Sequence, residues 1–124
     1  MMSKPIPQVK SQPPKKTRSQ EILSTVPFQN GFHFYTALGK YIGITANSLS
    51  EFAEKLQTIP VESIVFHFQR DDYQKWIRKV TGDEELANRL DQLKQWPAYS
   101  SDENLRKELV KTVQKRIREL KPTP

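Results

Sequence analysis

The chain has 124 residues, no cysteine and a formal net charge of +6. Its length fits one domain with one core, and the absence of cysteine excludes disulfides, thiolate metal sites and cysteine nucleophiles. We therefore expect a cytoplasmic protein held together by packing. We expect no membrane span and no secretory leader, because no apolar run approaches about 20 residues and Lys4 and Pro5 stand where a leader would be apolar.

The positive charge lies at the two ends of the chain. Residues 1–20 contain five basic residues and no acidic one, and residues 101–124 contain seven basic and four acidic residues. Between these ends, ten acidic residues outnumber eight basic ones. Clustered Lys and Arg release counterions when they dock on phosphates, so this distribution predicts a polyanionic partner.

Residues 1–20 form the first expected unit. They combine four prolines with Gln, Ser and Lys and contain few large apolar side chains, so nothing offsets the entropy lost on ordering. We expect a disordered basic arm here and a single mostly helical domain over residues 21–120. The arm could bind a polyanion or serve only for solubility. Its residues expected to contact nucleic acid are Lys10, Lys15, Lys16 and Arg18.

A short β element is expected at the start of the domain. Phe32 and Phe34 alternate about a histidine as one face of a strand would, and three glycines between residues 31 and 43 favour a hairpin over a helix. We expect most of these aromatic residues to fill the core, although Tyr35, Lys40 and Tyr41 could form a small stacking face.

Helical patterns begin after the aromatic segment. Ser48 and Glu51 have the spacing of a capping box, and apolar residues then recur at helical period up to Pro60. A second helix is expected after Pro60. A third is expected from about Asp71 to Gly82, where the glycine ends it.

Two more helices complete the expected fold. Thr81 and Glu84 have the spacing of another capping box and predict a helix that ends before residue 97. The last helix is expected over residues 101–120, with Ser100 and Glu103 as its capping residues.

The last helix is amphipathic. Its apolar residues fall within roughly 140° of the helical wheel, and four basic residues lie opposite them within roughly 80°. The four-residue spacing of these charges is mildly repulsive, so their arrangement is favoured only if a polyanion lies against it. A solvated outer face is the alternative. We call this set the basic ridge, and its members are Lys107, Lys111, Lys115 and Arg118.

Catalysis and metal binding have little support. Ser63, His67 and Asp71 would share one helix face, but no glycine-rich elbow accompanies the serine, and we expect Asp71 or Asp72 to cap the next helix instead. The two histidines would need carboxylates from elsewhere to bind zinc, and the phosphate-loop pattern fails around Gly39. We therefore expect a protein that is not an enzyme and uses no metal or cofactor.

The middle of the chain carries a family resemblance. Its motifs are Phe32-His33-Phe34, Ala46-Asn47-Ser48-Leu49-Ser50-Glu51-Phe52, Glu62-Ser63-Ile64-Val65-Phe66-His67, Arg70-Asp71-Asp72-Tyr73-x-x-Trp76-Ile77 and Gly82-Asp83-Glu84-Glu85-Leu86-Ala87. Over residues 31–90 this pattern resembles a family of small prokaryotic, largely archaeal domains of unknown function.

The resemblance implies an interaction or regulatory module without an assigned activity, and it implies that both flanks are additions of this chain. The family-like positions form either a buried hydrogen-bond network or a ligand-facing patch. They are Ser63, His67, Asp72, Tyr73 and Trp76.

Together these patterns predict a mainly α, small single-domain fold with a short N-terminal β element and a long basic amphipathic C-terminal helix. The leading function is non-catalytic binding of nucleic acid, RNA or DNA, through phosphate contacts, as an accessory protein of the ribosome or another ribonucleoprotein. The alternative is a protein-binding regulatory module that packs the apolar stripe of the last helix on a partner. Burial of that stripe in the chain's own core would favour the first function, because it would turn the basic ridge outward.

Overall fold

The computed structural model describes residues 17–95 and 101–121. The fold is mainly α, as expected, with one short β hairpin near its start and a long helix at its end. In chain order the elements are α2 (Arg18–Ile22), η1 (Phe28–Asn30), β1 (Phe32–Tyr35), β2 (Tyr41–Ala46), α3 (Leu49–Leu56), α4 (Val61–Gln69), α5 (Asp72–Trp76), η2 (Ile77–Thr81), α6 (Glu84–Gln95) and α7 (Asp102–Leu120).

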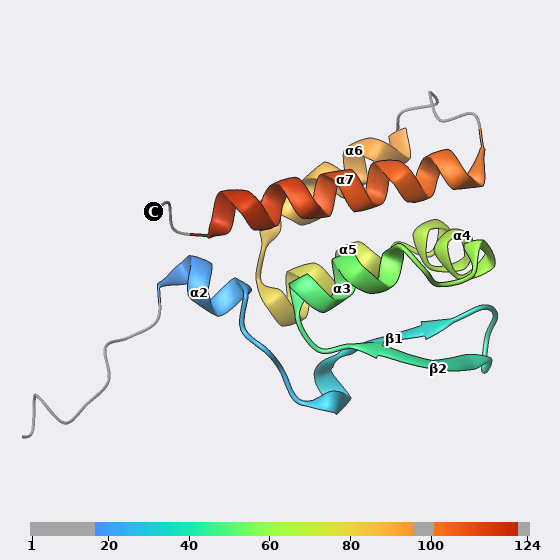
Figure 1. Ribbon diagram of the computed structural model, residues 1–124, viewed down its shortest axis with the longest axis horizontal. Coiled ribbons are helices and arrows are strands. Elements are labelled where there is room, and N and C mark those ends of the chain that lie inside the picture. Colours follow the sequence, from blue (N-terminus) through green and yellow to red (C-terminus); the bar gives the residue numbers. More distant parts are fainter. Residues whose placement is uncertain (1–16, 96–100, 122–124) are drawn as a thin grey trace, which may run out of the picture.

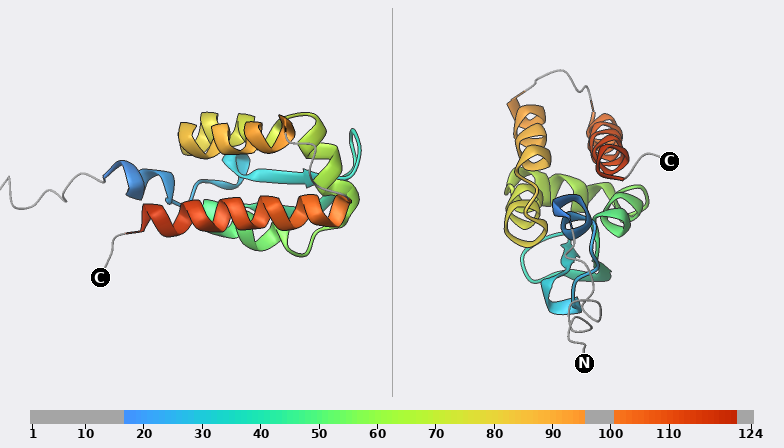
Figure 2. Two further views of the ribbon diagram at one scale, coloured as in Figure 1. Left: turned by 90° about the horizontal axis from the view of Figure 1, so that it is seen from above. Right: turned by 90° about the vertical axis from the view of Figure 1, so that its left-hand side faces the viewer.

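These elements form three layers (Figure 1). α6 and α7 lie side by side in one outer layer, α3, α4 and α5 form the middle layer, and the β1–β2 hairpin covers the other side of the middle layer. Figure 2 shows the same order end-on, with α2 near the end of α7. The core therefore fills two interfaces, one between the two helical layers and one between the middle helices and the hairpin.

The hairpin follows the predicted alternation. β1 pairs antiparallel with β2, with Phe32 opposite Ala46. Phe32 and Phe34 are buried against the helices, whereas the residues between and after them are partly exposed. Gly31 precedes the strand because a Cβ there would lie 2.7 Å from the Ala46 carbonyl oxygen, closer than packing allows.

The first predicted helix cap is present. The Ser48 Oγ accepts a hydrogen bond from the Glu51 N–H (3.1 Å), and the Glu51 carboxylate accepts one from the Asn47 N–H (2.7 Å). The return bond thus reaches one residue beyond the serine. These bonds satisfy backbone donors that the start of α3 would otherwise leave without a partner.

The other two predicted caps are wrong by one or two residues. α6 is capped by Asp83, whose Oδ1 accepts from the Leu86 N–H (3.2 Å), and not by Thr81. α7 is capped by Ser101, whose Oγ accepts from the Asn104 N–H (3.2 Å), one residue after the expected serine. Neighbouring residues of similar chemistry compete for each position, and the path of the chain selects between them.

The folded part of the chain begins earlier than predicted. Thr17 caps α2 in a capping box with Gln20, the Arg18 Nη2 donates to the Gly82 carbonyl oxygen (2.6 Å), and Ile22 is buried in the core. The prediction of a disordered arm over residues 1–20 is therefore wrong for residues 17–20. The rest of that arm, which contains Lys10, Lys15 and Lys16, lies outside the described residues.

The apolar stripe of α7 belongs to the core. Its members are between 0 and 8 % exposed and pack against α3, α4 and α6. They are Leu105, Leu109, Val113, Ile117 and Leu120, and Val110, the sixth apolar residue expected on this stripe, is partly buried against the same core. The chain's own core therefore covers the apolar stripe, and the basic ridge on the opposite side of α7 faces outward.

Candidate functional site

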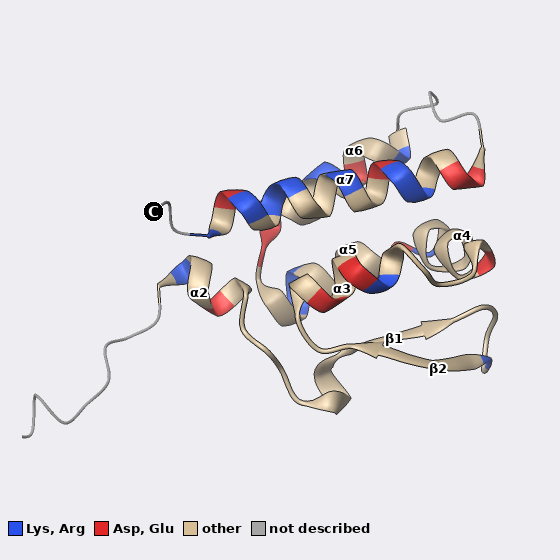
Figure 3. Ribbon diagram, in the orientation of Figure 1, with Lys and Arg blue, Asp and Glu red and all other residues tan. Residues whose placement is uncertain are grey.

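Lys and Arg recur along α7 (Figure 3). Lys107, Lys111, Lys115 and Arg118 of the basic ridge are all exposed, because they lie on the side of the helix opposite its buried residues. The structure thus brings the four predicted residues of α7 onto one surface. Arg18, also predicted as a phosphate contact, is instead used in the contact that docks α2.

The acidic residues nearest the ends of α7 do not neutralise the ridge. Glu103 pairs with Arg106 (2.8 Å), and Glu119 pairs with Arg116 (3.2 Å) and Arg89 (2.8 Å). Among the described residues, no ridge side chain makes an ion pair. The ridge is therefore exposed, and the described part of the chain supplies no short-range partner for its charge.

The remaining arginines of α7 hold the fold together. The Arg106 Nη1 donates to the carbonyl oxygens of Leu56 (2.9 Å) and Ile59 (2.8 Å) in the α3–α4 turn. Arg116 donates through Nε (2.9 Å) and Nη2 (3.1 Å) to the carboxylate of Asp83, which is 1 % exposed. This bidentate bond raises the pKa of Arg116 above its usual value and ties α7 to the start of α6.

Two grooves run along the ridge. One, of about 660 Å³, lies between α6 and α7 and includes Lys111 and Lys115. The other, of about 500 Å³, faces the end of α3 and includes Lys107, Lys111 and Arg118. Glu108 lines both grooves. The surface is basic on balance, and its lysines are reachable from both sides of the helix.

A second cluster of interest centres on His67 in α4. The Tyr35 N–H donates to its Nε2 (2.8 Å), and its Nδ1 lies 2.9 Å from the Oδ2 of Asp72. Because a backbone N–H can only donate, Nε2 must be unprotonated, so the proton of the neutral ring is on Nδ1 and donates to Asp72. The same carboxylate oxygen accepts from the Arg70 Nε (3.0 Å). These bonds join the α4–α5 corner to β1.

Burial keeps this histidine neutral. The rings of Phe32, Phe66 and Tyr73 surround it, with centroids 4.8, 5.0 and 5.6 Å away. Burial lowers the pKa of His67 from its usual 6.5, although the hydrogen bond to Asp72 acts in the opposite direction. Since both ring nitrogens are engaged and the ring is neutral, His67 acts as a structural crosslink.

The other family-like positions fill the core next to this crosslink. The Trp76 Nε1 donates to the Asn30 carbonyl oxygen (2.8 Å). Tyr73 and Ser63 are completely buried, and neither hydroxyl has a hydrogen-bond partner among the described residues. Burial raises the pKa of Tyr73. Of the family-like positions, His67, Asp72 and Trp76 make hydrogen bonds and also line a pocket, whereas Ser63 and Tyr73 do neither within the described part of the chain.

The spacing of Ser63, His67 and Asp71 does not produce a catalytic arrangement. The Asp71 carboxylate pairs with the Lys94 Nζ (2.7 Å), and His67 bonds to Asp72 instead. Asp71 is the N-cap residue of α5, in line with the expectation, but no side-chain cap bond is present there, because both carboxylates are used in these other contacts. In the described part of the chain, no group of three or more His, Asp or Glu residues could hold a metal ion.

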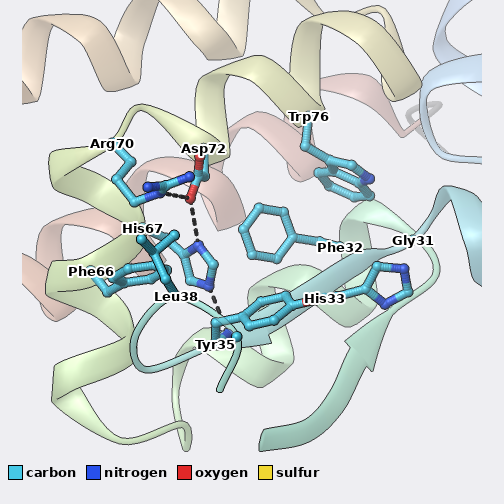
Figure 4. Close-up of a pocket in the computed structure, with 11 residues that line it drawn as sticks. Gly31, Phe32, His33, Tyr35, Leu38, Phe66, His67, Arg70, Asp72 and Trp76 are labelled. Carbon is cyan, nitrogen blue, oxygen red and sulfur yellow. Dashed lines mark hydrogen bonds and ion pairs between the residues drawn. The ribbon is translucent and has the colours of Figure 1, made fainter. Parts of the chain in front are cut away.

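The pocket has a volume of about 480 Å³ and opens between β1 and the α4–α5 corner (Figure 4). Aromatic rings supply most of its wall, with Phe32 and Tyr35 from β1 and Phe66 and Trp76 from the helices. Leu38, in the hairpin turn, lies at its edge and is 75 % exposed. Leu38 extends the apolar wall of the pocket, and a mostly apolar wall with a few polar groups is typical of small-molecule sites.

Arg70 is the charged donor at the edge of this pocket. Its guanidinium lies 5.0 Å from the centroid of the Phe66 ring, its Nε is held by Asp72, and its side chain is 46 % exposed. Among the described residues, its two terminal nitrogens have no hydrogen-bond partner. Asp72 therefore fixes the guanidinium through Nε, and the described residues leave its two terminal nitrogens, which form a fork of donors, open.

Sequence reasoning missed the pocket and the Asp83–Arg116 pair. A pocket wall made from β1 and α4 joins residues more than 30 positions apart, which no local pattern records. A single apolar residue in a turn, such as Leu38, gave no signal either, because isolated exposed leucines are common on protein surfaces.

The fold and these two surfaces define a small, mainly α domain with an outward-facing basic helix and an aromatic pocket. The chain belongs to a family of unknown function (DUF5752), whose family model matches residues 14–114. No curated protein and no solved structure shows significant similarity to it. None of the described helices has the length and apolar content to cross a membrane.

The family match corrects the predicted extent of the resemblance. The flanks were expected to lie outside the family, yet the match includes α2 and most of α7. The physical reason is that Ile22 of α2 and the apolar stripe of α7 belong to the same core as residues 31–90. The domain could not close over that core without them.

Proposed function

We propose that this protein is a non-catalytic nucleic-acid-binding protein that docks on phosphates through the basic ridge. The observation that carries the proposal is the burial of the apolar stripe of α7, in which Leu109 and Val113 are 0 % exposed. A helix whose apolar face is covered by its own core offers only its polar face to a partner. That face is basic, and the acids at its ends are engaged by Arg106, Arg116 and Arg89.

The spacing of the ridge suits a phosphate backbone. Lys107, Lys111 and Lys115 follow one another at four-residue intervals, which is about 6 Å per step along the helix. Phosphates of one duplex strand recur every 3.4 Å or so along the DNA axis, and a lysine side chain is long enough to adjust to them. No aromatic residue lies in α7, so base stacking is not expected and sequence preference should be weak.

We place this activity in the cytoplasm, on the ribosome or another ribonucleoprotein, where exposed phosphates are abundant. The sequence resemblance suggests prokaryotic, largely archaeal relatives. Lys10, Lys15 and Lys16 would add further phosphate contacts. The alternative, a protein-binding regulatory module, lacks the surface first assigned to it, because the apolar stripe of α7 is part of the core.

A salt titration of binding tests the proposal. A ridge variant and a control variant each lose three exposed or partly exposed lysines to glutamine, and binding to two unrelated DNA duplexes and one structured RNA is measured from low to moderate salt. The control lysines lie outside α7 and make no ion pair among the described residues. The ridge set is Lys107, Lys111 and Lys115, and the control set is Lys55, Lys75 and Lys79.

Each phosphate contact adds about −0.9 to the slope of log K against log salt concentration on B-DNA. The ridge variant should therefore flatten the slope by about 2.7 units if all three lysines touch phosphate, similarly on both duplexes, whereas the control variant should keep the original slope. Absence of binding at low salt, or equal slopes for the two variants, would reject the ridge as a nucleic-acid site.

A further inference from the structure

The aromatic pocket lies in a different part of the molecule from the basic ridge. It is formed where the hairpin meets the middle layer, whereas α7 belongs to the opposite outer layer (Figures 1 and 4). We propose that this pocket binds an apolar ligand that ends in a carboxylate, with the apolar body against the aromatic wall and the carboxylate on Arg70.

The wall of the pocket defines the apolar part of the ligand. Phe32, Tyr35, Phe66 and Trp76 contribute ring surface, and Leu38 adds an aliphatic side chain at the edge. The volume of about 480 Å³ lies within the range of small-molecule sites, which spans about 300–1,000 Å³. An aromatic or branched aliphatic group would bury both its own surface and that of the exposed leucine, which stabilises the bound state.

The charged end of the ligand follows from Arg70. Its Nε is occupied by Asp72, so the two terminal nitrogens remain as a planar pair of donors. Such a fork matches the two oxygens of a carboxylate, and charge-assisted bidentate bonds are stronger than bonds to a neutral acceptor. The negative charge of Asp72 is already shared between Arg70 and the Nδ1–H of His67, so it leaves the open side of the guanidinium for an anion.

The fork is also held in position before any ligand arrives. Asp72 is fixed by His67, which is fixed in turn by the Tyr35 N–H, and the guanidinium lies over the Phe66 ring. A donor that is already oriented loses little freedom on binding. The hydrogen-bond chain around His67 therefore positions the anchor of the pocket, in addition to joining the corner to β1.

The test compares acids with their amides. The first pair of probes is 2-naphthylacetic acid and 2-naphthylacetamide, and the second is the peptide acetyl-Ala-Ala-Gly-Phe with a free C-terminal carboxylate or a C-terminal amide. Binding to the full chain is followed by calorimetry and by shifts of the backbone amide signals of Tyr35, Leu38 and Phe66. If 2-naphthylacetic acid binds more tightly than the peptide acid, the ligand is a small carboxylic acid. If the peptide acid binds more tightly, the ligand is a peptide C-terminus.

We expect at least one acid to bind at the pocket about tenfold or more tightly than its amide. Arg70→Gln should remove that preference, Arg70→Lys should retain only part of it because the charge stays and the fork is lost, and Lys79→Gln should leave it unchanged as a control for charge. A thermal melt of each variant checks that the fold is intact. Equal affinity of acid and amide, an acid preference that survives in Arg70→Gln, or no binding of any probe at about 10 mM would overturn the proposal.

Discussion

Two sets of basic residues on α7 behave in opposite ways. Arg106 and Arg116 point toward the body of the protein and bind backbone carbonyls and a buried carboxylate. The basic ridge points to solvent and has no ion pair among the described residues. The forked guanidinium suits fixed acceptors, whereas an exposed lysine keeps its charge available. The comparison teaches that net charge alone does not identify a binding surface, because part of the charge is used within the fold.

The largest change in stability is expected when Asp83, the buried partner of Arg116, is replaced. Asp83→Ala should lower the free energy of unfolding by about 3 kcal/mol, because it leaves the guanidinium without its carboxylate and α6 without its cap. Asp83→Asn should cost less, since asparagine also caps helices. Urea unfolding measures both. Equal losses for the two variants would show that the cap contributes nothing beyond the ion pair, and no loss in Asp83→Asn would show that the ion pair contributes nothing beyond the cap.

A matched pair of neighbours tests the same contrast at the start of α7. Arg106→Ala should lower the free energy of unfolding by about 1–3 kcal/mol, because the carbonyl oxygens of Leu56 and Ile59 lose their donor. Lys107→Ala, one residue later on the exposed face, should change it by less than about 0.5 kcal/mol. If urea unfolding gave similar losses of free energy for Arg106→Ala and Lys107→Ala, the division of the basic residues of α7 into an inward and an outward set would be wrong.

His67, like the inward-pointing arginines, is used within the fold, because both of its ring nitrogens make hydrogen bonds. Its lowered pKa predicts that the free energy of unfolding depends on pH. The pKa of His67 is lower in the folded state than the usual 6.5, so between these two values the unfolded chain binds more protons. Stability should be fully present above about pH 6.5 and should fall as the pH drops through the folded pKa. His67→Gln should remove this dependence when the free energy of unfolding is measured from pH 7.5 to 5.5, although the variant is less stable throughout. His33→Gln, which changes the chain's other histidine, serves as the control and should keep the dependence.

The smallest effect is expected on the ridge itself. Lys111 has like-charged neighbours four residues away on both sides, at Lys107 and Lys115, and each such pair costs about 0.2–0.5 kcal/mol. Lys111→Gln should therefore raise the melting temperature slightly, whereas Lys79→Gln should leave it unchanged. A decrease in Lys111→Gln would mean that this lysine contributes to the fold and would place it with the inward arginines.

Local patterns predicted the elements well and their ends less well. The alternation of Phe32 and Phe34 and the capping residue Ser48 were confirmed, because each depends on a few neighbouring residues. The caps of α6 and α7 were misplaced because Thr81 competes with Asp83, and two adjacent serines compete at the start of the last helix. Periodicity cannot decide such competitions, since they depend on where the preceding chain enters the helix.

By itself the sequence determined which residues of α7 share a face, because the helical period sets that geometry wherever the segment is helical. The tertiary structure decided which face is covered, which arginines find buried partners and which lysines stay free, since these outcomes depend on distances to α3 and α6. It also decided the pocket. Arg70 and Phe66 line one pocket with Tyr35, more than 30 residues earlier, because the Tyr35 N–H donates to His67 and joins the hairpin to the helix corner.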